Sequence, residues 1–438
     1  MPTTQIFLAS TMYGTATLAA AIDSDLFPPA TRRVLLLSNN AATPETAPSL
    51  TEAPGFKSLR ERFDDVIHWN ETIAPLHPGG WTPRADDVPL WERHLRREWN
   101  LGDSKLSLIL ESIQVAPAQA IAQCFPDAPI DVYADGLMSY GPTRNKLDPL
   151  VGGRVRRLLH LDLVPGLRPL LLSEFGVRQG TVPKEAFLSV LRELSDGDGD
   201  LATDTDAPAL LLGQYLSALS ILTPEEEEEL HVRMLRGAVA RGHRRVVFKP
   251  HPSAPGRWSQ LLEREAERLG AHLTVFDAPL IAEVLFQRLR PALVVSCFST
   301  ALLTAHAFYG IPVARVGTEV LLERLTPYEN SNRIPVTLVD ALLPDLEATT
   351  QVAPPPTGEL SALLAAVGFA MQPQVLRAQR TRAEGYLLCH LSPRTRRYFK
   401  RRRLTALSLP GAVPQQLAFI PRNATVRRMA RRVRRLTA

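Results

Sequence analysis

The stretch RRVVFKPHPSAPGRW, residues Arg244–Trp258, joins a short apolar run to two prolines that bracket one histidine. A continuous apolar run of this length, followed by turn residues, is typical of a strand covered on both faces. Pro250 and Pro252 each fix their own φ angle and restrict the residue before them, which includes His251. The sequence therefore predicts an imidazole held firmly just past the end of a buried strand.

Similar apolar runs recur on both sides of this stretch and alternate with helical patterns such as Trp91–Trp99, which predicts parallel sheets. The first half of the chain carries such runs at Gln5–Ser10, Arg33–Ser38, Asp64–Trp69, Leu106–Glu111 and Ile130–Ala134. The second half carries them at Ala209–Leu216, Arg245–His251, His272–Phe276, Ala292–Phe298 and Pro312–Gly317. We expect two doubly wound α/β domains that face each other, with ligands bound beyond the carboxyl ends of the strands.

A polar, turn-rich segment, SDGDGDLATDTDAP, separates the two sets of runs and predicts a linker over residues 195–208. The expected units are an N-terminal domain over 1–194, a C-terminal domain over 209–345 and a basic C-terminal extension over 346–438. A helix of the second domain is expected to begin at Thr223, with proline in its first turn and glutamate at its third position. We interpret the acidic run Glu225–Glu229 as a favourable helix start that faces water.

Composition argues against a disulfide-rich secreted protein and against a membrane-spanning protein. The chain has 438 residues, of which 45% are hydrophobic and 22% charged, as in soluble globular proteins. Its three cysteines lie far apart, which fits a reducing compartment and argues against a disulfide framework. The opening MPTTQIFLAS lacks the pattern of a signal peptide, and the most apolar later stretch, 291–316, is interrupted by Pro and Gly. We expect a cytoplasmic protein.

Charge is distributed unevenly along the chain. Residues 377–438 contain 17 Lys and Arg against one acid, so this segment carries +16, while residues 1–376 carry −11. Two basic clusters occur, Arg394–Arg403 and Arg422–Leu436, and the second combines an apolar stripe at helical spacing with arginines around it. This pattern is typical of a helix on an anionic membrane surface. A solvated tail that packs partly on the acidic body is the alternative, and no nucleic-acid partner is expected.

Three candidate sites follow predicted strands. In the first, DVYADGLMSYGP (Asp131–Pro142), the strand ends at Ala134 and Asp135-Gly136 turns the chain. A carboxylate at such a point can accept a proton from a substrate hydroxyl. An ordinary Asp-Gly turn is the alternative.

In the second candidate site, Lys249 and His251 flank Pro250. A protonated imidazole beside a lysine can neutralise a phosphate and donate a proton to a departing oxygen. The alternative is a loop histidine that only caps a turn. The same dipeptide occurs at His77-Pro78, where no strand precedes it, and we interpret that one as a turn.

The third candidate site is VVSCFSTALLTAHA (Val294–Ala307), in which a strand runs into Ser296 and a helix is expected to start at Ser299-Thr300. Hydroxyls and free N–H groups at a helix N-terminus form a phosphate site. Simple N-capping by Ser299 is the alternative. We interpret Cys297 as a small buried residue, because no base is predicted beside it.

The order of the three sites resembles that of bacterial sialyltransferases and α-2,8-polysialyltransferases of the GT-B fold. His251 lies 116 residues after Asp135, and Ser299 lies 48 residues after His251. Those families carry an acidic-acidic-Gly motif, a His-Pro motif and a Ser/Thr motif, which correspond here to Ala134–Gly136, His251-Pro252 and Ser296–Thr300. The resemblance covers about residues 1–345 and includes LLLGQ at the start of the second domain.

The resemblance implies transfer of sialic acid, or a related nonulosonic acid, from its CMP-activated form to a glycan acceptor with inversion. Asp135 would accept the acceptor proton, and His251 would stabilise the departing CMP phosphate, together with Ser299 and Thr300. It implies no metal or other cofactor. The substrate-binding residues expected on this basis are Gly136, Gly213, Gln214, Lys249, Pro252, Ser296, Ser299 and Thr300.

One position departs from the family pattern, because Ala134 stands where the motif has its first acidic residue. Either Asp135 serves as the base or catalysis is impaired. One alternative function is that of a CDP-glycerol-dependent wall-polymer glycerophosphotransferase, which shares a CMP leaving group. Another is that of a non-catalytic surface-polymer or membrane-binding protein of the same fold. We expect a peripheral membrane role for the tail, and we expect the segment beyond Thr381 to be dispensable for folding.

Overall fold

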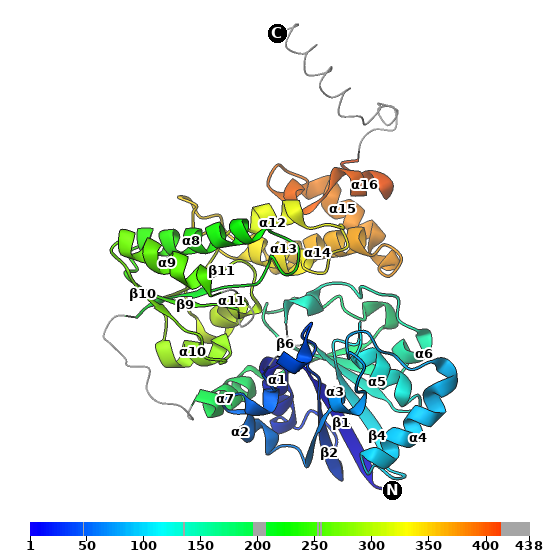
Figure 1. The fold of residues 1–438 in the computed structure, drawn as a ribbon. Coiled ribbons are helices and arrows are strands. Elements are labelled where there is room, and N and C mark those ends of the chain that lie inside the picture. Colours follow the sequence, from blue (N-terminus) through cyan, green and yellow to red (C-terminus); the bar gives the residue numbers. More distant parts are fainter. Residues whose placement is uncertain (47, 135, 196–206, 252–253, 255, 413–438) are drawn as a thin grey trace.

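The computed structural model describes the chain except residues 47, 135, 196–206, 252–253, 255 and 413–438. Two parallel sheets organise this part of the protein, each with helices on both faces (Figure 1). Within the described residues the first sheet has seven strands, in the order β3-β2-β1-β4-β5-β6-β7, and the second has five, in the order β10-β9-β8-β11-β12. Both orders are doubly wound, so the predicted pair of Rossmann-type α/β units is confirmed.

The strands of the first sheet are β1 (Thr3–Ala9), β2 (Arg32–Leu37), β3 (Asp65–His68), β4 (Lys105–Glu111), β5 (Ile130–Ala134), β6 (Val155–Leu161) and β7 (Arg178–Val182). Those of the second are β8 (Ala209–Leu212), β9 (Arg245–Lys249), β10 (His272–Val275), β11 (Leu293–Ser296) and β12 (Val313–Arg315). Every run predicted as a strand forms one. The sequence did not indicate β6 and β7, because charged residues interrupt the apolar run of β6 and β7 is a largely exposed edge strand.

The helices of the first unit are α1 (Met12–Asp23), α2 (Phe56–Arg60), α3 (Trp69–Thr72), α4 (Val88–Glu98), α5 (Ala118–Cys124), α6 (Pro149–Gly152) and α7 (Lys184–Ser195). Those that follow the linker are α8 (Pro224–Ala240), α9 (Arg257–Arg268), α10 (Ala282–Leu289), α11 (Thr300–Thr304), α12 (Thr318–Arg324) and α13 (Arg333–Leu342). The extension contributes α14 (Thr357–Met371), α15 (Arg380–His390) and α16 (Arg401–Ala406). Single turns occur at η1 (Pro44–Thr46), η2 (Leu50–Glu52), η3 (Ala85–Asp87), η4 (Leu137–Tyr140), η5 (Ser173–Phe175), η6 (Ala305–Tyr309), η7 (Arg377–Gln379) and η8 (Thr395–Tyr398).

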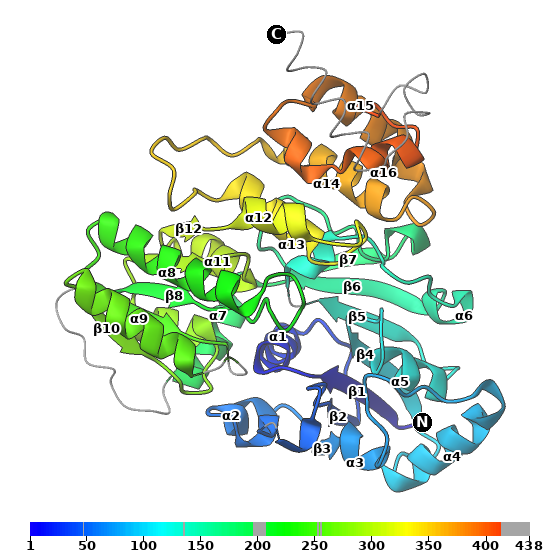
Figure 2. The ribbon, with the colours of Figure 1, turned by 45° about the horizontal axis from the view of Figure 1, so that its top comes forward.

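Helix α1 lies where the two units meet, as Figure 2 shows, and nearly all of its side chains are buried. The Tyr13 hydroxyl lies 3.2 Å from Oγ1 of Thr304 in the second unit. A second contact joins the units through α7, where the Lys184 ammonium donates to the carbonyl of Ala307 at 3.1 Å. These contacts bring the carboxyl ends of both sheets toward one region.

Helix α14 returns from the second unit to the first. The Gln372 amide donates to the carbonyl of Arg144 at 2.9 Å, and Gly368 packs against Leu170 and Pro142. An added Cβ at Gly368 would lie 3.0 Å from a methyl of Leu170, so a larger residue would require that side chain to shift. The extension therefore packs against both units.

The first basic cluster, Arg394–Arg403, is part of the fold. Tyr398 and Phe399 are buried, and the Tyr398 hydroxyl donates to Asp340 on α13 at 2.7 Å. The prediction that the chain beyond Thr381 is dispensable for folding is therefore wrong, because its removal would expose these core contacts. The second cluster, Arg422–Leu436, and most of the linker lie outside the described residues. No helix in the described part of the chain is long and apolar enough to cross a membrane.

Candidate active site

The loop after β8 joins the second and third candidate sites; we call residues Gly213–Ser217 the β8 loop. The Gly213 N–H donates to the carbonyl of Lys249 at 2.9 Å, which continues the pairing of β8 with β9. A Cβ atom at Gly213 would lie 3.2 Å from the ring of Phe248. Glycine thus lets the loop pass close to the strand that carries Lys249.

Gln214 connects the β8 loop to the third candidate site. Its Oε1 accepts the N–H of Phe298 at 2.9 Å and lies 3.4 Å from the Ser296 hydroxyl. Ser296 is fully buried, and its hydroxyl donates to the carbonyl of Leu212 at 2.8 Å. These contacts fix the turn after β11 to the turn after β8, so Ser296 has a structural role in the site.

Lys249 ends β9 at the carboxyl edge of the sheet, as the sequence predicts. Its ammonium donates to the carbonyl of Ala278 at 3.2 Å and lies 5.6 Å from the centre of the Phe276 ring. Loss of solvent around the ammonium lowers the pKa of Lys249 below its usual 10.5. Carbonyl and aromatic contacts hold the ammonium, and an arriving anion can supplement them.

His251 lies two residues beyond β9, with an exposed side chain and its ring 6.1 Å from that of Tyr215. Its carbonyl accepts the N–H of Ala254 at 2.8 Å. The pKa of His251 lies below the usual 6.5, first because nearby protein displaces water from the ring and second because the charge of Lys249 repels a proton. Pro252 lies outside the described residues.

The first and third candidate sites meet across the junction of the two units. The Thr300 Oγ1 atom accepts the N–H of Leu137 at 3.4 Å and would lie 2.9 Å from a Cβ atom at Gly136. Glycine at 136 therefore allows this close approach. Ser299 caps α11 by accepting the N–H of Ala301 at 3.3 Å. Asp135 lies outside the described residues, between the buried end of β5 and Gly136.

Sequence reasoning missed the role of Glu227. The predicted capping box at the start of α8 is confirmed by the reciprocal bonds of Thr223 and Glu226, but Glu227 does not face water. Its carboxylate is fully buried and accepts the N–H groups of Leu216 at 2.7 Å and Ser217 at 2.8 Å. A run of five glutamates gives no sign of which one turns inward. Periodicity with the buried residues of α8, three and four positions on, is the pattern that indicates it.

Cys297 and His77 occupy the settings that the sequence predicts. Cys297 is fully buried and its pKa is raised by burial, so the interpretation as a small core residue is confirmed. His77 is also a turn residue, as predicted. Its Nδ1 accepts the N–H of Gly79 at 3.1 Å, and its Nε2 lies 2.9 Å from the carbonyl of Ala41.

A cavity of 640 Å³ opens at the carboxyl ends of β2 and β3 in the first unit. Its polar lining includes Ser38, Asn39, His68, Asn70, Glu71 and His77. Residues 76–78 also line it, and no sequence pattern predicted this cavity. The cavity can form hydrogen bonds to a polar ligand from several sides.

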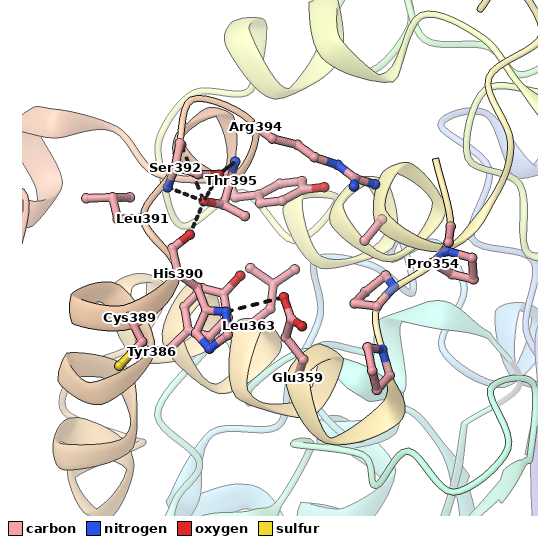
Figure 3. A pocket seen from close by; sticks show the side chains of 15 residues that line it. Pro354, Glu359, Leu363, Tyr386, Cys389, His390, Leu391, Ser392, Arg394 and Thr395 are labelled. Atoms are coloured by element: carbon pink, nitrogen blue, oxygen red, sulfur yellow. Dashed lines mark hydrogen bonds and ion pairs between the residues drawn. The ribbon is translucent and has the colours of Figure 1, made fainter. Parts of the chain in front are cut away.

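A second cavity, of 510 Å³, lies in the extension (Figure 3). His390 stacks on Tyr386 with ring centres 4.9 Å apart, and its Nδ1 lies 3.4 Å from the Glu359 carboxylate. None of the residues predicted for catalysis or donor binding lines it. Among the described residues no group of three or more His, Cys, Asp or Glu is arranged to hold a metal ion, and independence from metal stays a prediction.

Two doubly wound units whose motif loops meet at their junction have the architecture of the GT-B class of glycosyltransferases. The chain belongs to the alpha-2,8-polysialyltransferase family, whose model matches residues 5–318. The family implies a nucleotide-sugar donor and a glycan acceptor. The roles of the individual site residues stay predictions.

Solved structures show only distant likenesses. The GT-B domain of a sialyltransferase from Photobacterium damselae is 12% identical, with 77% of this chain and 96% of that chain covered and a TM-score of 0.42. UGT2 of Phytolacca americana is 11% identical over 93% of this chain and 99% of that chain, with a TM-score of 0.43. A mutant O-GlcNAc transferase of Thermobaculum terrenum is 13% identical over 93% and 67%, with a TM-score of 0.37. No curated protein sequence matches the chain significantly.

Proposed function

We propose that this glycosyltransferase moves sialic acid, or a related nonulosonic acid, from its CMP-activated donor to a glycan acceptor with inversion. The observation that carries the proposal is the convergence of the three motifs. The β8 loop binds to both Lys249 and Phe298, and Thr300 contacts the chain at Gly136. Together with membership of the family, these contacts support a single site for the expected donor-binding and acceptor-activating groups.

On the donor side, His251 and Lys249 balance the charge of the CMP phosphate, with hydroxyls from Ser299 and Thr300. As the bond from the anomeric carbon to the phosphate oxygen breaks, His251 donates a proton to that oxygen. A phosphate beside the ring raises the pKa of His251, so donor binding supplies the protonated form that the free site disfavours. No metal is part of the proposal.

On the acceptor side, Asp135 accepts the proton of the attacking hydroxyl as the new glycosidic bond forms. The 640 Å³ cavity beside β2 and β3 supports a glycan acceptor, since amide, imidazole and carboxylate groups line it. Strands β1 and β4 separate β2 from β5, a span of about 14 Å at the usual strand spacing. An acceptor that fills the cavity and reaches the end of β5 is therefore an oligosaccharide rather than one sugar.

A donor screen tests the proposal and its nearest alternative, glycerophosphate transfer from CDP-glycerol. The purified enzyme is incubated with CMP-sialic acid, CDP-glycerol or a UDP-sugar, each with sialylated acceptors of one to six residues. We expect CMP release and chain extension with CMP-sialic acid alone, an inverted anomeric centre by NMR, and better turnover on longer acceptors. Turnover with CDP-glycerol but not CMP-sialic acid would replace the proposal with the alternative.

A further inference from the structure

Glu227 is a buried carboxylate that the start of α8 does not need. The capping box forms without it: the Thr223 hydroxyl accepts the N–H of Glu226, and the Glu226 carboxylate accepts the N–H of Thr223. The two hydrogen bonds of Glu227 both leave the helix, at 2.7 Å and 2.8 Å, and end on adjacent residues of the β8 loop, Leu216 and Ser217.

Burial of a carboxylate is costly unless hydrogen bonds compensate for the lost water. Bonds from N–H groups to a carboxylate are stronger than those between neutral groups, and the positive end of α8 favours a negative charge in its first turn. Glu227 therefore holds the β8 loop more firmly than a neutral side chain would. The buried Glu227 carboxylate is retained despite its desolvation cost, which indicates that the position of the β8 loop is constrained.

The β8 loop contacts both donor-side motifs at once. Gly213 bonds to the carbonyl of Lys249, and the ring of Tyr215 lies 6.1 Å from that of His251. Tyr215 is in turn supported by buried Trp258, with ring centres 5.6 Å apart. Gln214 accepts the N–H of Phe298, one residue before Ser299. Movement of this loop would change the distance between the His-Pro and Ser/Thr segments.

We propose that Glu227 is a positioning residue of the donor site: by fixing the β8 loop, it sets the distance between His251 and the Ser299-Thr300 hydroxyls. Glu227 touches no substrate in this proposal. The inference rests on the proposed function for the identity of the donor, but not for the coupling between the three segments.

The test compares Glu227→Gln with Glu229→Gln, a matched change on the exposed face of the same helix, where Glu229 pairs with Arg236. In Glu227→Gln one N–H of the loop faces the new amide NH₂ group. We expect donor KM to rise at least about tenfold, as expected for loss of one charge-assisted hydrogen bond, with acceptor KM unchanged. Hydrogen exchange should quicken in segments 213–217, 249–251 and 296–300 and stay unchanged in the first unit.

The two readouts separate the possible failures. Kinetics equal to those of Glu229→Gln, or faster exchange spread over the whole chain, would overturn the positioning role. A wild-type enzyme that uses no CMP-activated donor would end the proposed function. In that case exchange in the three segments still decides the inference, because that readout needs no donor.

Discussion

His251 is the residue on which the proposed chemistry most depends. It is exposed, beside Lys249, and its pKa lies below the usual 6.5 in the free enzyme. An acid catalyst must carry its proton, so activity that depends on it is lost as pH rises through its pKa. The free enzyme should therefore lose this form at a lower pH than the enzyme with bound phosphate.

We expect kcat/KM for the donor, which reports the free enzyme, to fall with rising pH from below pH 6.5, and kcat to fall at higher pH. His251→Ala should lower kcat by about two to four orders of magnitude and remove this limb. His272→Ala is the control, since His272 is exposed at the opposite end of β10. Steady-state rates between pH 5 and 9 provide the measurement. An unchanged limb in His251→Ala would assign the acid elsewhere.

His231 lies beneath the donor side but faces rings rather than water. It is buried against Phe248 and Trp258, and neither ring nitrogen has a hydrogen-bond partner among the described residues. Burial lowers its pKa to about 4. The unfolded chain therefore binds this proton more readily than the folded one between pH 6.5 and 4.

The contribution of His231 titration to the free energy of unfolding should be complete above pH 6.5. It should fall by about 3 kcal/mol as pH decreases toward 4. His231→Leu removes this titration, so its free energy of unfolding should fall less than that of the wild type between pH 7 and 4.5. Urea denaturation at the two pH values measures the difference. His272→Gln should retain the wild-type change. Parallel behaviour of wild type and His231→Leu would mean that the imidazole is not buried in solution.

At the scale of elements, a buried ion cluster fastens the extension to α13. Asp340 has no exposed side-chain surface and pairs with Arg315 at 3.2 Å and Arg397 at 3.0 Å. It also accepts hydrogen bonds from the hydroxyl groups of Thr318 and Tyr398, both at 2.7 Å. Residues that the charge pattern assigns to a basic tail are thus partners of one buried acid.

Asp340→Asn leaves two arginines without their shared partner, and we expect the free energy of unfolding to fall by about 3–5 kcal/mol. The exposed pair of Glu347 with Arg233 provides the control, because Glu347→Gln should cost about 1 kcal/mol or less. Limited proteolysis should cut Asp340→Asn first between residues 377 and 412. Equal losses in the two variants would show that the cluster does not fasten the extension.

At the scale of the whole molecule, charge separates a basic C-terminus from an acidic body. Residues 413–438 contain seven arginines and no acid, and they follow an extension that is packed into the fold. A membrane role for the C-terminus is therefore best tested by a chain that ends at residue 412. Such a chain keeps the buried contacts of Tyr398 and Phe399.

The full-length protein should co-sediment with anionic vesicles at low salt and be released at 1 M salt, where the Debye length is about 3 Å. The chain ending at residue 412 should stay in the supernatant and keep its activity on a soluble acceptor. Neutral vesicles should retain neither protein. Vesicle binding by the shorter chain would place the membrane contact on the folded body.

The sequence by itself determined the two-domain α/β architecture, because apolar runs of strand length alternate with helical patterns and need no distant information. It likewise indicated the Lys249–His251 strand end and the Ser299 cap, whose physical causes are local. Strand β7 escaped prediction because an exposed edge strand needs no apolar run.

Only the tertiary structure turned Glu227 inward and gave Arg397 a buried partner. Neighbouring residues of the same charge cannot be told apart from composition. Which of them is buried depends on the partners that the fold brings within reach. The contact between Gly136 and Thr300 was likewise decided by packing, since 164 residues separate the two in the chain.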